Sequence, residues 1–304
     1  MSDQDACEPP SSIEADEAPE SESAPRDVSG LVLVSTPIGN LGDVTMRGLA
    51  ALRDADLVLC EDTRTTAKLL SAYSIGVRCE ALHDHNEEQR IPGLIARLRN
   101  GAKIALVSDA GTPLVSDPGF RLVRAAIAEG IRVTAAPGAN AALLALTLSG
   151  LPPHPFLFLG FPPARDGARR SHFAGLRAAE QAGLAATMIW YEAPHRLPEM
   201  LADLATVFGA REAVVARELT KRFEEVRRGD LPTLAAHYAH NRARGEIVVL
   251  IGPGAAEVSS EADIDGLLVA ALATMSVKDA AAMVAAATGS PKKAIYARAL
   301  ELKD

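Results

Sequence analysis

The chain has 304 residues, of which 48% are hydrophobic and 23% are charged, which fits a folded protein of about two domains and excludes the disordered, collagen-like and coiled-coil classes. Its three cysteines lack CxxC and Cys/His spacings, so we expect neither a disulfide framework nor a zinc site, and a reducing cytoplasm fits best. No run approaches the roughly 18 apolar residues of a membrane span, and the N-terminus is acidic where a signal peptide is basic, which disfavours membrane insertion and secretion.

The negative charge is concentrated at the start of the chain. Residues 1–27 hold nine Asp or Glu against Arg26, which accounts for the whole formal charge of -8. This segment has four prolines and few large apolar side chains, so we predict a disordered acidic tail over residues 1–29. The neutral remainder argues against a strongly basic DNA-coating protein but permits a local cationic groove for RNA.

From Gly30 onward, short apolar runs alternate with amphipathic stretches, the pattern of βα units around a mostly parallel sheet. The predicted strands of the first half cover residues 31–35, 57–60, 104–108 and 131–135. Helices are predicted over residues 44–52, with Asp43 as N-cap, and 141–149. Polar segments follow the strands, so they collect at the carboxyl edge of the sheet, where open parallel sheets bind ligands.

A proline-rich segment at residues 150–155 is predicted to link two halves. Beyond it, predicted strands cover residues 156–159, 186–191, 213–216 and 246–251. The Ala-rich end of the chain reads as helical, with Thr288-Gly289-Ser290-Pro291 between two helices. We therefore expect an α/β fold of two αβα domains, residues 30–152 and 153–256, with a small C-terminal helical domain at 262–304.

Common nucleotide-binding signatures are missing, since neither GxGxxG nor GxxxxGK[ST] follows any predicted strand. Small and turn-forming residues stand at several strand ends instead, at residues 37–40, 108–113, 117–119 and 137–138. Small side chains there let a flat ligand lie against the backbone, although glycine and proline also simply shape turns.

Six motifs in chain order resemble a known family. They are Ser-Thr-Pro-Ile-Gly-Asn-Leu at 35–41, Glu-Asp-Thr-Arg at 61–64, Leu-His-Asp-His-Asn-Glu at 82–87, the segment 108–119, Tyr-Glu-Ala-Pro-His-Arg-Leu at 191–197 and Arg-Glu-Leu-Thr-Lys at 217–221. Together they resemble the ribosomal RNA small subunit methyltransferase I family, a branch of the tetrapyrrole methylase superfamily. In that family Pro137-Gly138 is usually followed by Pro and then Ser or Cys, whereas Ala139 and Asn140 follow here.

The resemblance implies a class III methyltransferase that uses S-adenosylmethionine for 2'-O-methylation of a cytidine ribose in 16S rRNA, near the decoding centre. It also implies a homodimer that acts on 16S rRNA or the small ribosomal subunit, and a methyl donor held in the cleft between the two αβα domains. Rival interpretations are a tetrapyrrole or protein side-chain methylase of the same superfamily and a non-enzymatic nucleic-acid-binding protein.

For the donor site, Asp109 follows a strand within a glycine-containing loop, where its carboxylate could accept hydrogen bonds from the donor or merely cap the loop. The resemblance extends the predicted donor-binding set to Pro37, Gly39, Ser108, Thr112, Pro137, Asn140, Ala141, Tyr191 and Glu246. His83-Asp84-His85 suggests a metal cluster, but an extended segment supplies only two imidazoles on one side. We expect no metal, because a sulfonium is already an activated electrophile.

For the chemical step, a ribose hydroxyl is a weak nucleophile, so a base or a cationic neighbour is useful. The candidates are Glu192, His195, Glu218 and Lys221. If residues 217–221 are helical, Glu218 and Lys221 share one face, as a catalytic pair or as an ordinary solvated ion pair. Positioning alone, with no essential base, is the alternative.

For RNA, the candidate phosphate contacts are Arg64, Arg165, Arg169, Arg170, Arg196, Lys221 and Arg222. Aromatic residues make up only 4% of the chain, which disfavours a broad stacking platform. The C-terminal helices resemble the small helix-turn-helix end domain of the family and either contact RNA or pack on the body.

Overall fold

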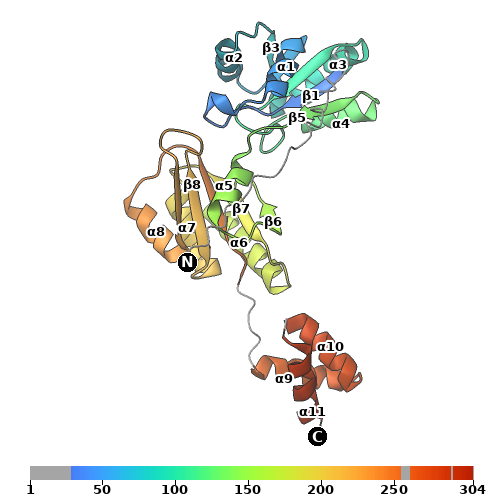
Figure 1. Cartoon of the computed structure of the whole chain (residues 1–304), viewed down its shortest axis with the longest axis vertical. Helices are drawn as coiled ribbons and strands as arrows, with labels where there is room; N and C mark the ends of the chain where they lie inside the picture. The colour runs from blue at the N-terminus through green and yellow to red at the C-terminus, as the bar shows by residue number, and fades with distance from the viewer. Residues whose placement is uncertain (1–28, 255–260, 289, 304) are drawn as a thin grey trace, which may run out of the picture. The chain divides into compact units, whose positions relative to one another are not determined.

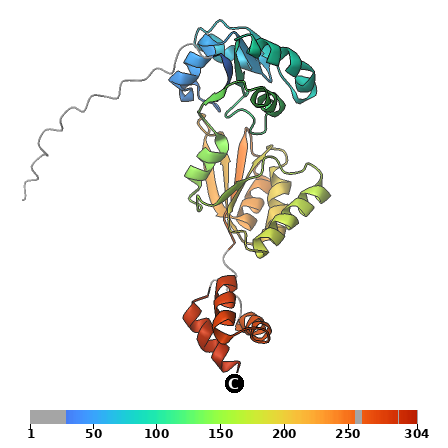
Figure 2. The same cartoon turned by 90° about the vertical axis from the view of Figure 1, so that its right-hand side faces the viewer.

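The computed structural model describes residues 29–254, 261–288 and 290–303 (Figures 1 and 2). The predicted acidic tail at 1–29 therefore lies, apart from its last residue, outside the described residues. Among the helices of the described segments, none is both long and apolar enough to cross a membrane.

The first sheet is fully parallel, with strand order β3-β2-β4-β1-β5. Its elements are β1 (Gly30–Val34), a 3₁₀ turn (Leu41–Asp43), α1 (Met46–Asp54), β2 (Leu57–Cys60), α2 (Thr63–Ala72), β3 (Cys79–Ala81), α3 (Asp84–Arg99), β4 (Lys103–Val107), α4 (Phe120–Ala128) and β5 (Val133–Ala136).

Strand β2 shows how the sequence builds this layer. Leu57 and Leu59 belong to one buried cluster, with side chains of α3 and α4, whereas Val58 and Cys60 belong to another, with side chains of α1 and α2. A strand whose alternate side chains are all buried must be covered on both faces, which is why its sequence is a continuous apolar run.

The second sheet is mixed, with strand order β6-β7-β10-β8-β9. Only β6 and β7 pair in parallel, whereas β10 runs antiparallel to β7 and β8, and β8 runs antiparallel to β9. Its elements are α5 (Ala141–Ser149), β6 (Phe156–Phe158), α6 (Asp166–Gln181), β7 (Thr187–Glu192), α7 (Leu197–Phe208), β8 (Glu212–Arg217), β9 (Glu225–Asp230), α8 (Leu231–His240) and β10 (Ile247–Ile251). The prediction of a mostly parallel sheet is wrong for this half.

Helix α5 packs with the second sheet, although the predicted boundary at 152/153 assigned it to the first domain. Ala145 and Leu146 of this helix are buried in one cluster with Ile189, Val214 and Leu250 of three strands. The described chain divides into one compact unit with residues 29–36 and 44–138 and another with residues 37–43 and 139–303. The other face of the second sheet is covered by α6, α7 and α8.

The C-terminal helices are α9 (Glu261–Leu272), α10 (Val277–Thr288) and α11 (Lys292–Glu301). They share a small core of their own, which contains Leu268, Val284 and Ile295. Helix α10 ends at Thr288 and α11 begins at Lys292, in agreement with the two helices predicted on either side of this segment. The predicted fold class, an α/β protein with two sheets and a C-terminal helical domain, is confirmed as well.

Candidate active site

The carboxyl edge of the first sheet is tied together by Thr36. Thr36 follows β1, and its backbone exchanges two hydrogen bonds with Gly111, at 2.9 and 3.1 Å. Its Oγ1 donates to the carbonyl of Ser108, 3.0 Å away, at the end of β4. These bonds fix the start of the loop 108–119, which contains three of the predicted donor-binding residues, Ser108, Asp109 and Thr112.

Acidic side chains gather at this edge. Asp109 is half-buried, and its Oδ1 accepts a hydrogen bond from the backbone of Asp62, 3.0 Å away, at the start of α2. Burial raises the pKa of Asp117, and the charges of Glu61 and Asp109 raise it further, against a lowering hydrogen bond from Ser108. The edge therefore carries a negative potential that suits a positively charged ligand.

Pro137 and Asn140 make hydrogen bonds that hold the start of a helix or the loop before it. The Pro137 carbonyl accepts a hydrogen bond from the Thr45 hydroxyl at 3.4 Å. Thr45 is also the N-cap of α1, because its Oγ1 accepts the Gly48 N–H at 3.1 Å, so the prediction of Asp43 as the cap is wrong. Asn140 caps α5 through its Oδ1 and the Leu143 N–H, 3.1 Å apart, and Ala141 is the first residue of that helix. Asparagine and serine are both favourable caps, which gives the departure at position 140 a structural reason.

Lys221 lies at the centre of a second polar cluster. Its Nζ donates to Glu218 Oε1 at 2.8 Å and to Glu246 Oε2 at 2.7 Å. Glu218 Oε1 also accepts the Glu246 N–H at 3.1 Å. The structure thus brings together Glu218, Lys221 and Glu246, which were predicted in two different roles.

The protonation states in this cluster follow from its contacts. The hydrogen bond from Lys221 lowers the pKa of Glu218, although burial opposes the shift. Burial alone would lower the pKa of Lys221, but its bonds to the two glutamates outweigh burial and raise it. Both shifts favour the ion pair of a Lys221 ammonium with a Glu218 carboxylate.

The backbone that carries this cluster is a tight turn. Glu218 and Thr220 have positive φ values of 50° and 65°, so residues 217–221 are not helical, and Glu218 and Lys221 meet through the turn instead of along one helix face. A Cβ on Gly39, whose φ is +155°, would lie 2.4 Å from Lys221 Cγ, and one on Gly245 would lie 2.1 Å from Glu218 Oε1. Only glycine at these two positions lets the backbone lie against the cluster.

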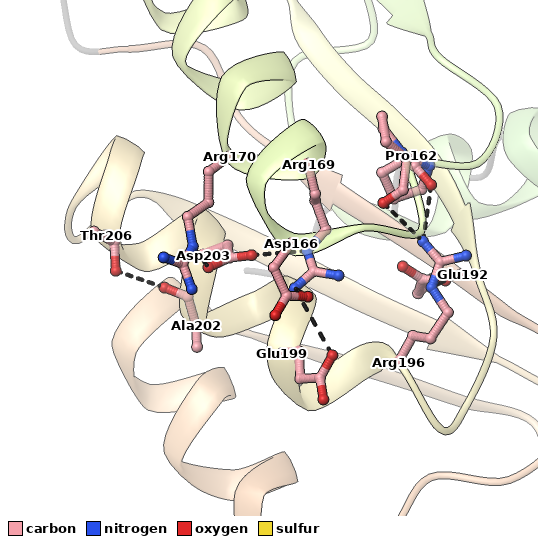
Figure 3. Close-up of polar contacts among 11 residues, drawn as sticks. Pro162, Asp166, Arg169, Arg170, Glu192, Arg196, Glu199, Ala202, Asp203 and Thr206 are labelled. Carbon is pink, nitrogen blue, oxygen red and sulfur yellow. Dashed lines mark hydrogen bonds and ion pairs between the residues drawn. The ribbon is translucent and has the colours of Figure 1, made fainter.

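Glu192 is buried at the end of β7 (Figure 3). Its side chain has no exposed surface, and its Oε1 lies 2.8 Å from the Ala193 N–H and 3.2 Å from Arg196 Nε. Oε2 has no hydrogen-bond partner among the residues that the structure describes. Burial raises the pKa of this carboxyl, against the lowering effects of Ala193 and Arg196. In this arrangement Glu192 holds the turn that follows it rather than facing a substrate.

The neighbours of Glu192 point elsewhere. Tyr191 lies on the opposite face of the strand, within the cluster that contains α5, and His195 is exposed. Arg169 is buried and donates through Nε to Asp203 Oδ2 at 2.7 Å, so the prediction that it contacts RNA phosphates is wrong for this arrangement (Figure 3). Sequence reasoning also missed Asp203, whose position on the buried side of α7 is visible only once that helix is placed.

The segment His83-Asp84-His85 was predicted to be extended, and this prediction is wrong. His83 is the N-cap of α3, and Asp84 begins that helix. Across the described segments, no group of three or more His, Cys, Asp or Glu side chains could hold a metal ion. Cys60 and Cys79, the cysteines within the described part, are free.

Comparison with known proteins identifies the family. A family model for tetrapyrrole (corrin/porphyrin) methylases matches residues 30–235, and one for the RsmI C-terminal HTH domain matches residues 258–303. A Mesorhizobium japonicum protein named ribosomal RNA small subunit methyltransferase I is 50% identical over 276 residues, 90% of this chain and 92% of its own. Its namesake from Escherichia coli O157:H7 is 43% identical over 284 residues, 92% and 98% of the two chains.

The chain belongs to the ribosomal RNA small subunit methyltransferase I family. Diphthine synthase shares the fold of this family member with a TM-score of 0.57 at 17% identity, covering 73% of this chain and 90% of its own. A cobalt precorrin-4 methyltransferase of cobalamin biosynthesis has a TM-score of 0.55 at 17% sequence identity, and the match covers 73% of this chain and 94% of that one. These two structures show the fold alone. Methyltransferases of the tetrapyrrole methylase family use S-adenosylmethionine.

Proposed function

We propose that the chain transfers a methyl group from S-adenosylmethionine to the 2'-hydroxyl of a cytidine ribose in 16S rRNA. The observation that carries this proposal is the 50% identity to a ribosomal RNA small subunit methyltransferase I over nine-tenths of both chains. The six predicted motifs lie within the matched length, and several of them form the two polar clusters described above.

The first sheet fits the donor by charge. S-adenosylmethionine is positively charged at sulfur and at its amino group, and the edge that would receive it carries Glu61, Asp62, Asp109 and Asp117. Asp109 would accept hydrogen bonds from the donor, with the loop residues Ser108 and Thr112 beside it. When bound, the donor supplies a methyl carbon already activated by its positive sulfur.

Lys221 supports the chemical step by electrostatics. As the 2'-oxygen bonds to the methyl carbon, the carbon–sulfur bond breaks with both electrons staying on sulfur, and the hydroxyl proton must leave. A protonated Lys221 stabilises the charge that develops on the oxygen. Glu246, whose side chain is 69% exposed, is the carboxylate of the cluster that is open to accept the proton. Glu218 holds Lys221 in place, and His195 is the alternative proton acceptor.

Ribose methylation in the cell tests the proposal. Mass-spectrometric mapping of 16S rRNA from cells that lack this gene should show the loss of one cytidine 2'-O-methyl group. A wild-type copy should restore it, and a Lys221→Met copy should act at least about a hundredfold more slowly in vitro. Lys68→Met, which removes an exposed lysine from α2, is the matched control. An unchanged methylation pattern at every cytidine would refute the assignment.

We also propose that the protein acts in the cytoplasm as a homodimer on the small ribosomal subunit, as the family resemblance implies. Sedimentation should then give twice the chain mass of 31.9 kDa. Calorimetric titration with S-adenosylmethionine separates this proposal from a non-enzymatic nucleic-acid-binding protein, which would bind RNA but no donor. A tetrapyrrole or protein side-chain methylase would bind the donor but leave 16S rRNA unmodified.

A further inference from the structure

Three aromatic rings meet beside the end of β7. The ring centroid of Tyr191 lies 4.9 Å from that of Phe158 and 5.7 Å from that of Phe161, with interplanar angles of 63° and 62°. Such edge-to-face pairs are the favourable geometry for aromatic side chains. The chain has only seven Phe, four Tyr and one Trp, so a quarter of its aromatic residues gather here.

The loop that carries Phe161 is braced at both sides of that residue. The Tyr191 N–H donates to the Gly160 carbonyl at 2.9 Å. Arg196 Nη2 donates to the carbonyls of Pro162 and Pro163 at 2.8 and 3.3 Å, as Figure 3 shows beside Glu192. A loop whose backbone is already fixed loses little conformational entropy when a ligand binds, so binding costs less free energy.

Phe161 itself remains open although its loop is fixed. The residue is 55% exposed, so it keeps surface that a ligand can contact. Its ring is in T-shaped contact with Tyr191. A rigid, exposed aromatic face is what a planar ligand needs for stacking.

The surroundings of Phe161 carry positive charge. Arg165 lies four residues further along the same loop, is exposed, and has no side-chain hydrogen bond or ion pair with any described residue. His195 is exposed on the turn whose next residue, Arg196, holds this loop. The one carboxylate nearby in sequence, Asp166, pairs with Arg169 at 3.1 Å. An exposed ring and a guanidinium without a described partner, on one short loop, suit a nucleotide, with the base on the ring and the phosphate on the cation.

We propose that Phe161 stacks on an unpaired base of the substrate RNA and that Arg165 contacts a phosphate of the same strand. This inference rests on the proposed function and adds a base-binding contact to it. The adenine of the methyl donor is the competing source of a planar base. A small-molecule site buries most of its ligand, however, and Phe161 is open. The positive flank also favours a polyanion over a donor that is itself positively charged.

Steady-state kinetics with undermethylated small ribosomal subunits test the inference. Phe161→Ala should raise the KM for the subunits about tenfold, the equivalent of ~1.4 kcal/mol and the lower range of stacking energies. The KM for S-adenosylmethionine should not change, and the melting temperature should fall only by the small amount that loss of one aromatic pair gives. Phe156→Ala is the matched control, because Phe156 is a 42% exposed Phe on β6 that has no ring partner within the described part of the chain. A higher KM for the donor, or no change in either KM, would overturn the inference.

Photo-crosslinking provides a readout that does not depend on turnover. A benzoylphenylalanine at position 161 should crosslink to 16S rRNA close to the methylated cytidine, and the same group at position 156 should not. If the wild-type protein fails to methylate the subunits but position 161 crosslinks, the proposed function falls and the RNA contact stands. If the wild type methylates them while position 161 gives no crosslink and Phe161→Ala is normal, the inference alone falls.

Discussion

At the scale of single residues, Glu192 shows how a strand assigns different environments to neighbouring side chains. Successive side chains of β7 point to opposite faces, so Trp190 and Glu192 face the helices α6 and α7 while Tyr191 faces α5. A carboxylate on the helix-covered face loses its hydration, which disfavours its charged form. Ala193 and Arg196 compensate only in part, because Oε2 stays without a partner.

This imbalance predicts that Glu192→Gln raises thermal stability at neutral pH. Burial raises the pKa of Glu192, so proton uptake there favours the folded state, and the wild type gains stability from this group as the pH falls. The amide of Gln is neutral at every pH, so the variant avoids the cost of burying a charged carboxylate at neutral pH as well. The variant should melt roughly 2–4 °C higher near neutral pH, the shift that about 1 kcal/mol gives a protein of this size.

A pH series of thermal melts checks the sign. The difference between Glu192→Gln and wild type should shrink as the pH approaches the ordinary glutamate value of 4.5, where the wild-type carboxyl is protonated. Glu88→Gln, at an exposed position of α3, should melt like the wild type throughout. A variant that melts below wild type at neutral pH would mean that the contact with Arg196 outweighs burial.

At the scale of elements, the turn at 218–221 depends on a loop far away in the sequence. Residue 39 needs to be glycine because a Cβ there would overlap the aliphatic chain of Lys221. We predict that Gly39→Ala displaces Lys221 and slows methyl transfer about tenfold or more. Gly76→Ala is the control, because nothing lies within 4 Å of a Cβ at that position. Normal turnover by Gly39→Ala would show that Lys221 has room to move without loss.

The sequence predicts the strongly apolar elements best. Strand β2 and helix α5 have the predicted bounds, because a buried strand and a buried helix are continuous apolar runs. Strand β9, with the sequence Glu-Val-Arg-Arg-Gly-Asp, was missed because it lies at an edge of the sheet and its charged side chains are solvated or paired. The antiparallel pairing in the second sheet was missed as well. The alternation of apolar and polar residues locates a strand, but it does not tell whether the strand pairs in parallel or antiparallel.

The candidate site was predictable in its residues but not in its geometry. The motifs named Glu218 and Lys221, and the family resemblance added Glu246, yet the contact between Lys221 and Glu246 joins residues 25 apart through a turn with two positive φ values. Such φ values in residues other than glycine are uncommon and carry no reliable sequence signal. Asp109 was placed correctly at a strand end because that prediction needed only the order of strand and loop.

At the scale of the whole molecule, the chain has separate cores. Each sheet has a buried cluster on either face, and a smaller cluster joins α9, α10 and α11. All described members of this last cluster come from residues 264–302. The exposed side of α11 presents Lys293, Tyr296 and Leu300, whose spacing puts them on one helix face.

We therefore predict that deleting residues 262–304 weakens RNA binding without unfolding the two sheets. A core that is complete within three helices contributes little to the melting temperature of the rest, so the main transition should shift by no more than roughly 2 °C. Binding to undermethylated small subunits should fall because Lys293 and Tyr296 are lost, whereas calorimetric binding of S-adenosylmethionine should persist. The full-length variant Ile295→Asp, which introduces a charge into the helical core, should reproduce the RNA defect without the truncation. A main transition several degrees lower in the truncated protein would instead show that the helices stabilise the sheets by packing on them.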